Sequence, residues 1–181
     1  MRALASHIRP ATSGDAPGIA RVQVLTWQQT YRGILPDSFL DGLDVERSAE
    51  SWRAVVADRR RVTHVIDAMG ILGFCTAGPS RGDPNGYRGE VEAIYIDPTE
   101  QGQGHGTALV RAAMDWLAAK RLTPVLVWAL EANTRAHGFY QSLGAHRLDT
   151  RLLRIADALY PEVGFGWPDS GHPPGRPVTG G

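Results

Sequence analysis

The segment Glu100 to Val110, EQGQGHGTALV, places three glycines between polar residues, directly before a stretch with helical periodicity. A helix N-terminus presents N–H groups without intrahelical partners, and the helix dipole adds partial positive charge there. Glycines at 102, 104 and 106 carry no side chain that would hold an anion away from these groups. The segment therefore predicts a site for a diphosphate. A tight turn without a ligand is the alternative interpretation.

The spacing of the glycines argues against a common nucleotide site. A P-loop would read GxxxxGK[ST], and this loop contains no lysine. The Rossmann pattern GxGxxG fails as well, because Thr107 stands where the third glycine should be. We therefore expect neither an ATP nor an NAD site, while a nucleotide-binding switch stays open as a third hypothesis.

Strands and helices that could position this loop follow from the apolar patterns along the chain. One helix begins after a cap at Ser13 or Asp15 and ends near residue 31. Asn133 caps the last helix, which Gly144 ends. Together the elements predict a mixed α/β sheet with helices packed on it. We expect strands at 7–9, 61–68, 70–78, 90–97, 123–131, 145–155 and 160–167, and further helices at 45–58 and 104–120.

Composition limits the class of protein. The 181 residues suffice for one domain, expected at 7–167, and the polar segment 168–181 is expected to be a disordered tail. Charges balance at 19 basic and 19 acidic residues, so we expect no nucleic-acid or membrane partner. Histidine spacing predicts no metal site, and Cys75, the single cysteine, is expected to be a buried, inert thiol. Without a signal segment, a cytoplasmic location is expected.

Two segments resemble the GNAT superfamily of acetyl-coenzyme A-dependent N-acetyltransferases. The sequence QGQGHG at 101–106 is similar to its Q/R-x-x-G-x-G/A signature. The order of elements also resembles that superfamily over 7–167, and TWQQTYRGILPDSF resembles a bacterial subgroup with mostly unassigned substrates. The sequence LEANTRAHGFYQSLGA resembles its N-x-x-A-x-x-F-Y-x-x-x-G segment, with matches at Asn133, Ala136, Phe139, Tyr140 and Gly144.

The resemblance implies a mostly antiparallel sheet of about six or seven strands, splayed between strands 4 and 5 and flanked by about four helices. Main-chain groups at the splay would pair with the pantetheine arm of acetyl-CoA, like an added strand. The loop amides would hold its pyrophosphate, and Asn133 would contact the pantetheine end or act only as a cap. The residues assigned to acetyl-CoA are Ile94, Tyr95, Ile96, Gln101, Gly102, Gln103, Gly104, His105, Gly106, Thr107, Asn133, Ala136 and Tyr140.

Acetyl transfer to an amine needs a base and an acid, because a lysine-like amine titrates near about 10.4 and a thiolate departs. Tyr140 matches the superfamily tyrosine that protonates the sulfur; its alternative role is a core aromatic. Glu90 and Glu92 are the candidate bases, two residues apart and so on the same side of one strand. Glu90 takes the position of the glutamate base in histone-type members, and Glu92 lies nearer the splay. Catalysis through water alone, with both glutamates on an exposed face, is the alternative.

The acceptor site in this superfamily lies between the first two helices and the last hairpin, which implies that Trp27, Tyr31, Arg32, Phe39 and Tyr160 line it. Core packing is the alternative for these residues. We expect direct attack by a primary amine of a small molecule or peptide on acetyl-CoA in a ternary complex. A non-catalytic acetyl-CoA-binding sensor of the same fold is the competing hypothesis, and a homodimer is possible in either case.

Overall fold

A computed structural model describes residues 7–82 and 86–168; the predicted tail lies outside this part of the chain except for Pro168. Within it, seven strands form one sheet that five α-helices flank, as the sequence predicted, with one helix more than the four expected. The elements are β1 (His7–Pro10), α1 (Ala16–Thr30), α2 (Asp37–Asp41), α3 (Val45–Ala57), β2 (Val62–Asp67), β3 (Ile71–Pro79), β4 (Gly89–Ile96), α4 (His105–Ala119), β5 (Val125–Leu130), α5 (Thr134–Ser142), β6 (His146–Ile155) and β7 (Ala158–Trp167).

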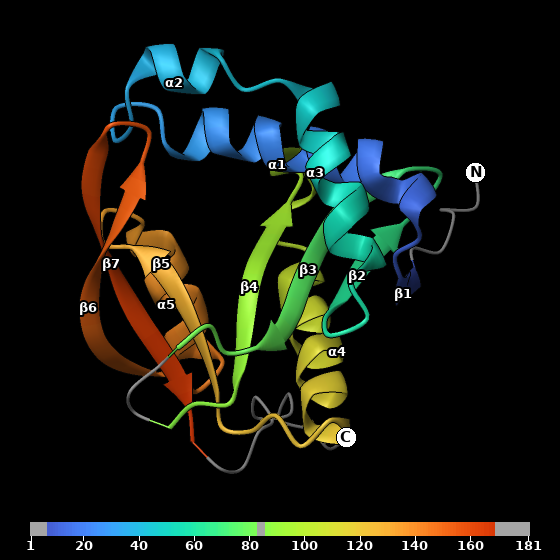
Figure 1. The fold of residues 1–181 in the computed structure, drawn as a ribbon, viewed down its shortest axis with the longest axis vertical. Helices are drawn as coiled ribbons and strands as arrows, with labels where there is room; N and C mark the ends of the chain where they lie inside the picture. The colour runs from blue at the N-terminus through green and yellow to red at the C-terminus, as the bar shows by residue number, and fades with distance from the viewer. Residues whose placement is uncertain (1–6, 83–85, 169–181) are drawn as a thin grey trace, which may run out of the picture.

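The sheet has the strand order β1-β2-β3-β4-β5-β7-β6, and only β4 and β5 run parallel to each other. Helices α1 and α3 pack on one face of β2 and β3, around the buried ring of Phe74. Helix α4 covers the opposite face of the same strands, and α5 lies behind β5 and β7 (Figure 1). Strand β4, in the middle of the sheet, contacts α1 on one face and α4 on the other.

The parallel pairing of β4 and β5 is short. It joins Gly89 to Val125, Glu90 to Leu126 and Val91 to Val127, and then stops although both strands continue. Beyond these pairs the two strands diverge toward α1 (Figure 1). The splay between strands 4 and 5 that the resemblance implied is therefore present. Among the described residues, no strand pairs with the β5-facing edge of β4 after Val91.

Helix α4 turns a slightly different face to the sheet from the one its sequence suggested. Helical spacing of the apolar residues at 104–120 predicts an inner face that includes Ala108, Ala112 and Trp116, but these residues are only half-buried. The face instead runs through Leu109, Val110, Ala113, Met114 and Leu117. Alanine is small and fits both buried and exposed positions, so the apolar pattern alone does not determine which side of the helix faces the sheet.

Gly89, at the start of the short parallel pairing, is a position where a side chain has no room. A Cβ built there would lie 2.3 Å from the carbonyl oxygen of Leu122, which belongs to the backbone and cannot rotate away. We expect Gly89→Ala to lower the free energy of unfolding by about 1–3 kcal/mol, as overpacking does. Chemical denaturation measures this change.

Gly138 provides the matched control, because a Cβ there meets nothing within 4 Å and the residue lies inside α5. Gly138→Ala should raise the free energy of unfolding by about 0.5–1 kcal/mol, since alanine is the better helix former. Equal effects of the two substitutions would contradict the close approach at Gly89.

Candidate active site

A cavity of about 420 Å³ occupies the opening between β4 and β5. Its walls come from α1, β4, the glycine loop, the start of α4, β5 and α5. All but one of the residues assigned to acetyl-CoA line it. They are Ile94, Tyr95, Ile96, Gln101, Gly102, Gly104, His105, Gly106, Thr107, Asn133, Ala136 and Tyr140. The exception is Gln103, whose side chain donates to Glu100 Oε2 at 2.9 Å.

The glycine loop closes one end of the cavity. Gly102 and Gly104 have φ angles of 80° and 83°, a left-handed conformation that glycine adopts without strain, and a Cβ at either position would meet nothing within 4 Å. Because α4 begins at His105, its first-turn amides lack intrahelical acceptors. Gly106 is required for another reason, since a Cβ there would approach the Phe139 ring to 3.1 Å. The backbone N–H groups near Gly102 and Gly104 are therefore open to a ligand, whereas Gly106 allows α4 and α5 to pack closely.

The exposed edge of β4 is only partly available to a ligand. Ile94, Tyr95 and Ile96 pair with β3 on one side and face the cavity on the other. The carbonyl oxygen of Ile96, however, accepts hydrogen bonds from Thr26 Oγ1 at 3.3 Å and from Gln101 Nε2 at 3.1 Å. The expectation that main-chain groups of all three residues are free is therefore wrong for this carbonyl. Its two donors tie the edge of β4 to α1 and to the loop.

Asn133 acts as a helix cap and as part of the cavity wall. Its Oδ1 accepts from the amide of Ala136 at 3.2 Å, which confirms the predicted cap. Its Nδ2 donates to the hydroxyl of Tyr31 at 3.4 Å, across a sequence separation of 102 residues. The start of α5 is thereby linked to the end of α1 at the cavity.

Tyr140 lines the cavity from α5 and is 5% exposed. Its ring packs among Phe139, Phe165 and Trp167 at centroid distances of 5.4, 5.8 and 6.2 Å. Burial raises the pKa of this phenol well above its ordinary value, so the hydroxyl keeps its proton at neutral pH. The residue is therefore a core aromatic that also borders the cavity.

Glu92 lies where the sheet opens. The β3–β4 register passes from Thr76↔Ala93 to Ala77↔Val91, so Glu92 has no partner on β3 and forms a β-bulge. The residue lines the cavity. Its Oε2 accepts from Arg61 Nη1 at 3.1 Å, whereas Oε1 is buried without a hydrogen-bond partner among the described residues. Burial raises the pKa of this carboxyl, and the charge of Arg61 opposes that rise.

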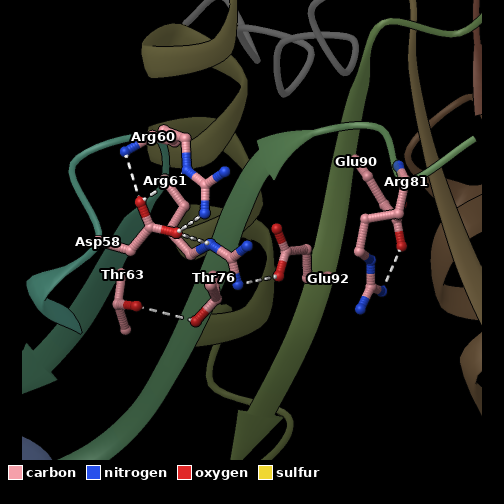
Figure 2. A network of polar contacts seen from close by, with 8 residues as sticks. All are labelled: Asp58, Arg60, Arg61, Thr63, Thr76, Arg81, Glu90 and Glu92. Atoms are coloured by element: carbon pink, nitrogen blue, oxygen red, sulfur yellow. Dashed lines mark hydrogen bonds and ion pairs between the residues drawn. The ribbon is translucent and has the colours of Figure 1, made fainter. Parts of the chain in front are cut away.

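Arg61 is itself held by a second carboxylate (Figure 2). Its Nε lies 3.2 Å from Oδ2 of Asp58, which Arg60 also contacts at 2.9 Å. The hydrogen bond from Arg60 lowers the pKa of Asp58 to about 2, so Asp58 stays ionised. The chain Asp58–Arg61–Glu92 therefore fixes one guanidinium group against the carboxylate at the cavity.

Glu90 occupies a different environment from Glu92. Its side chain is 2% exposed and does not line the cavity. Arg81 holds both carboxylate oxygens, through Nη2 at 2.6 Å and its backbone N–H at 3.1 Å (Figure 2). The two glutamates that the sequence left as equal candidates are thus separated by their partners, and only Glu92 borders the cavity.

Of the residues assigned to the acceptor, Tyr31 alone lines the cavity. Trp27, Phe39 and Tyr160 pack with it in an apolar cluster, the Trp27 ring lying 5.2 Å from Tyr31 and 6.2 Å from Phe39. Arg32 points to α2, where it pairs with Asp37 at 3.1 Å and Asp41 at 2.8 Å. Trp27, Phe39 and Tyr160 are thus partly buried residues of this apolar cluster and do not line the cavity.

Trp128 and Phe139 line the cavity but were not assigned to it from the sequence. Val91 and Val127 form the last parallel pair, so Glu92 and Trp128 are the first residues beyond it, one on each diverging strand. A Cβ on Gly164 would lie 3.2 Å from the Trp128 ring, so the absence of a side chain lets the indole lie against β7. The register that places Trp128 there depends on strand pairing, for which the sequence carries no local signal.

Other reactive groups in the described residues do not form a second centre. Cys75 is fully buried, and burial raises its thiol pKa to about 12, in agreement with the inert thiol expected. Within residues 7–82 and 86–168 no three His, Cys, Asp or Glu side chains gather as metal ligands would. In the same residues no helix has the length and apolar character needed to cross a membrane.

Comparison with known proteins agrees with this geometry. Residues 24–145 match the family described as Acetyltransferase (GNAT) family. The uncharacterized N-acetyltransferase YuaI of Bacillus subtilis is 33% identical over 163 residues, which cover 90% of this chain and 92% of YuaI. The mycothiol acetyltransferase of Rhodococcus erythropolis is 31% identical over 81% of this chain, but this chain covers only 55% of that protein.

A solved structure shows the same fold with a ligand. The acetyltransferase yncA of Salmonella typhimurium, determined with its cofactor acetyl-CoA, superposes with a TM-score of 0.69 at 18% identity, covering 91% of this chain and 94% of yncA. The seven-stranded splayed sheet, the glycine loop and the cavity define a GNAT-type acyltransferase. The chain belongs to the GNAT acetyltransferase family.

Arg61 should control the ionisation of Glu92. Replacing it by glutamine, Arg61→Gln, removes the one cation in contact with this carboxylate while burial remains. The pKa of Glu92 should therefore rise, because the larger of the two arginine charges that offset the cost of burying this carboxylate is lost and only that of Arg81 remains. NMR titration of the Glu92 side-chain carboxyl carbon measures the change without reference to activity.

The neighbouring arginine is the control for this prediction. Arg60 contacts Asp58 but not Glu92, so Arg60→Gln should leave the titration of Glu92 nearly unchanged. If both substitutions moved the Glu92 titration equally, the specific contact between Arg61 and Glu92 would not be its cause.

Proposed function

We propose that this chain catalyses transfer of an acetyl group from acetyl-CoA to a primary amine by direct attack in a ternary complex. The observation that carries the proposal is a single cavity bounded by the glycine loop, Tyr140 and Glu92. These groups supply the three functions that the reaction needs: an anion cradle, a proton donor and a proton acceptor. The complex of yncA with acetyl-CoA supports the choice of acyl donor.

The residues present fit acetyl-CoA. First-turn amides of α4, beside the open positions of Gly102 and Gly104, suit the pyrophosphate. The unpaired edge of β4 at Ile94 suits an amide-bearing arm, which would bind as an added strand. Asn133 and Ala136 would border the far end of that arm. The bound cosubstrate supplies a thioester, and every other function falls to side chains of this chain.

Glu92 would take the proton from the acceptor amine, directly or through a water molecule. Its raised pKa makes it a stronger base than an exposed glutamate. The amine nitrogen then forms the new bond to the acyl carbon while the carbon–sulfur bond breaks. Tyr140 would give its hydroxyl proton to the departing sulfur, and its buried phenol is protonated at neutral pH for that purpose.

Binding of the cosubstrate is the first experiment. At ~100 times its dissociation constant, acetyl-CoA should add roughly 2.7 kcal/mol to the free energy of unfolding, which a thermal-shift assay detects easily. ATP and GTP should give no comparable shift. Stabilisation by the nucleotides but not by coenzyme A would support a nucleotide switch and overturn the proposal.

Turnover separates catalysis from simple binding. Thiol release from acetyl-CoA over a panel of amines should fall about 10²-fold in Glu92→Gln, the range expected for loss of a general base. Tyr140→Phe should lower kcat by about 10-fold or more while acetyl-CoA still binds. Glu90→Gln should have the smaller effect of the two glutamate substitutions, because Glu90 is tied to Arg81 outside the cavity. Tight acetyl-CoA binding without turnover of any amine would favour the non-catalytic sensor.

A further inference from the structure

Three buried carboxylates lie on the face of the sheet opposite α4 and α5. Val91 and Val163 point into the core beneath these helices, so the residues before them in the strands, Glu90 and Glu162, point to the other face. Glu92 at the bulge lies in front of the same sheet (Figure 2). The side chains of Glu90, Glu92 and Glu162 are 2%, 8% and 6% exposed.

Each of these carboxylates pairs with one arginine that is more exposed than its partner. Arg81 holds Glu90, Arg61 holds Glu92, and Arg151 contacts Glu162 through Nε. The arginine side chains are 56%, 23% and 39% exposed, in the same order. Negative charge therefore lies inside and positive charge outside on this face. The first two of these pairs are visible in Figure 2.

The three pairs form one electrostatic patch. The hydrogen bond to Glu90, together with the charges of Glu92 and Glu162, raises the pKa of Arg81. The guanidinium group of Arg81 thus interacts electrostatically with Glu90 and Glu92 on β4 and with Glu162 on β7. Of these six charged residues only Glu92 lines the cavity, so a ligand there would contact Glu92 directly and lie in the field of the others.

Arg151 lies against Trp128, a residue of the cavity wall. Its guanidinium carbon lies 4.0 Å from the centroid of the Trp128 ring, and Trp128 lines the cavity opposite Glu92. Stacking on the indole and the contact of Nε with Glu162 together restrict the group to one orientation. Arg151 donates to Glu162 through Nε. Its two terminal nitrogens have the geometry that binds a carboxylate in a bidentate manner.

We propose that the acceptor is a small amino-carboxylate, such as an α-amino acid, whose ammonium group faces Glu92 and whose carboxylate binds Arg151 on Trp128. The inference rests on the proposed function, since it names the second substrate of the same cavity. The inner carboxylate attracts the amine, and the outer guanidinium groups attract the anion beside it. A polyamine would place positive charge against Arg81 and Arg151, and the N-terminus of a peptide carries a neutral amide in place of the carboxylate.

Matched acceptor pairs test this assignment. Each common α-amino acid is compared with its own primary amide, using thiol release from acetyl-CoA at fixed pH, with spermidine and a neutral tripeptide as further acceptors. The best amino acid should show kcat/KM at least about tenfold above that of its amide, as expected for a charge-assisted, two-pronged contact. Spermidine and the tripeptide should be poorer still. Equal kcat/KM for acid and amide, or a preference for spermidine or the tripeptide, would overturn the proposal.

Substitution of Arg151 then tests whether this residue causes the preference for the carboxylate over the amide. The acid-to-amide ratio is kcat/KM for an amino acid divided by kcat/KM for its amide. Arg151→Gln should bring this ratio close to one. Arg151→Lys should restore part of the preference, because lysine keeps the charge without the bidentate geometry of the guanidinium group. Arg147→Gln is the control on the same strand, since Arg147 pairs with Glu131 at 3.7 Å and both side chains are about half exposed. A ratio that persists in Arg151→Gln would contradict the role of Arg151.

Two measures keep the result interpretable. The double variant Arg151→Gln/Glu162→Gln avoids a buried unpaired carboxylate, and the acid-to-amide ratio is independent of the fraction of folded enzyme. If no acceptor turns over, the proposed function fails. The inference is then decided by calorimetry on the protein saturated with coenzyme A: tighter binding of the amino acid than of its amide supports it, and equal binding overturns it.

Discussion

The early end of the β4–β5 pairing is the constraint on which the rest of the structure depends. Parallel neighbours normally exchange hydrogen bonds along their whole common length, yet these strands pair only from Gly89 to Val91. The remaining edge of β4 must find other partners, and Thr26 and Gln101 provide two of them at the Ile96 carbonyl. The cavity exists because the strands part, and its position follows from where the last pair lies.

Features that depend on neighbouring residues in the chain could be predicted from the sequence. The Asn133 cap, the helix end at Gly144 and the glycine loop follow from local chemistry, so the order of elements and the loop that borders the cavity were predictable. The bulge at Glu92 and the position of Trp128 were not, because both are set by pairing with strands distant in sequence. The sequence also could not show that Trp27 and Phe39 pack in an apolar cluster beside the cavity, since aromatic residues at helical spacing look alike in a core and in a binding wall.

The charges around the cavity illustrate why composition is a poor guide to a site. The chain is neutral as a whole, and its sequence shows no acidic cluster. Folding nevertheless collects Glu90, Glu92 and Glu162 from two strands and buries each beside one arginine. Burying these charges costs free energy that the ion pairs offset only in part. An arrangement of this kind is typical of a functional site rather than of a structure optimised for stability alone.

The two ends of the cavity differ in how they are encoded, and this difference bears on how the protein can evolve. The anion cradle comes from one continuous segment at the start of α4, where most substitutions would alter backbone geometry. Elsewhere the wall draws single side chains from separate elements, such as Glu92 on β4 and Trp128 on β5. Arg61, before β2, contacts Glu92, and Arg151, on β6, contacts Trp128. A mutation at one of them can change what is recognised there while the cradle stays intact. Under the proposed function, the acyl-donor site could therefore be conserved while the acceptor site changes one side chain at a time.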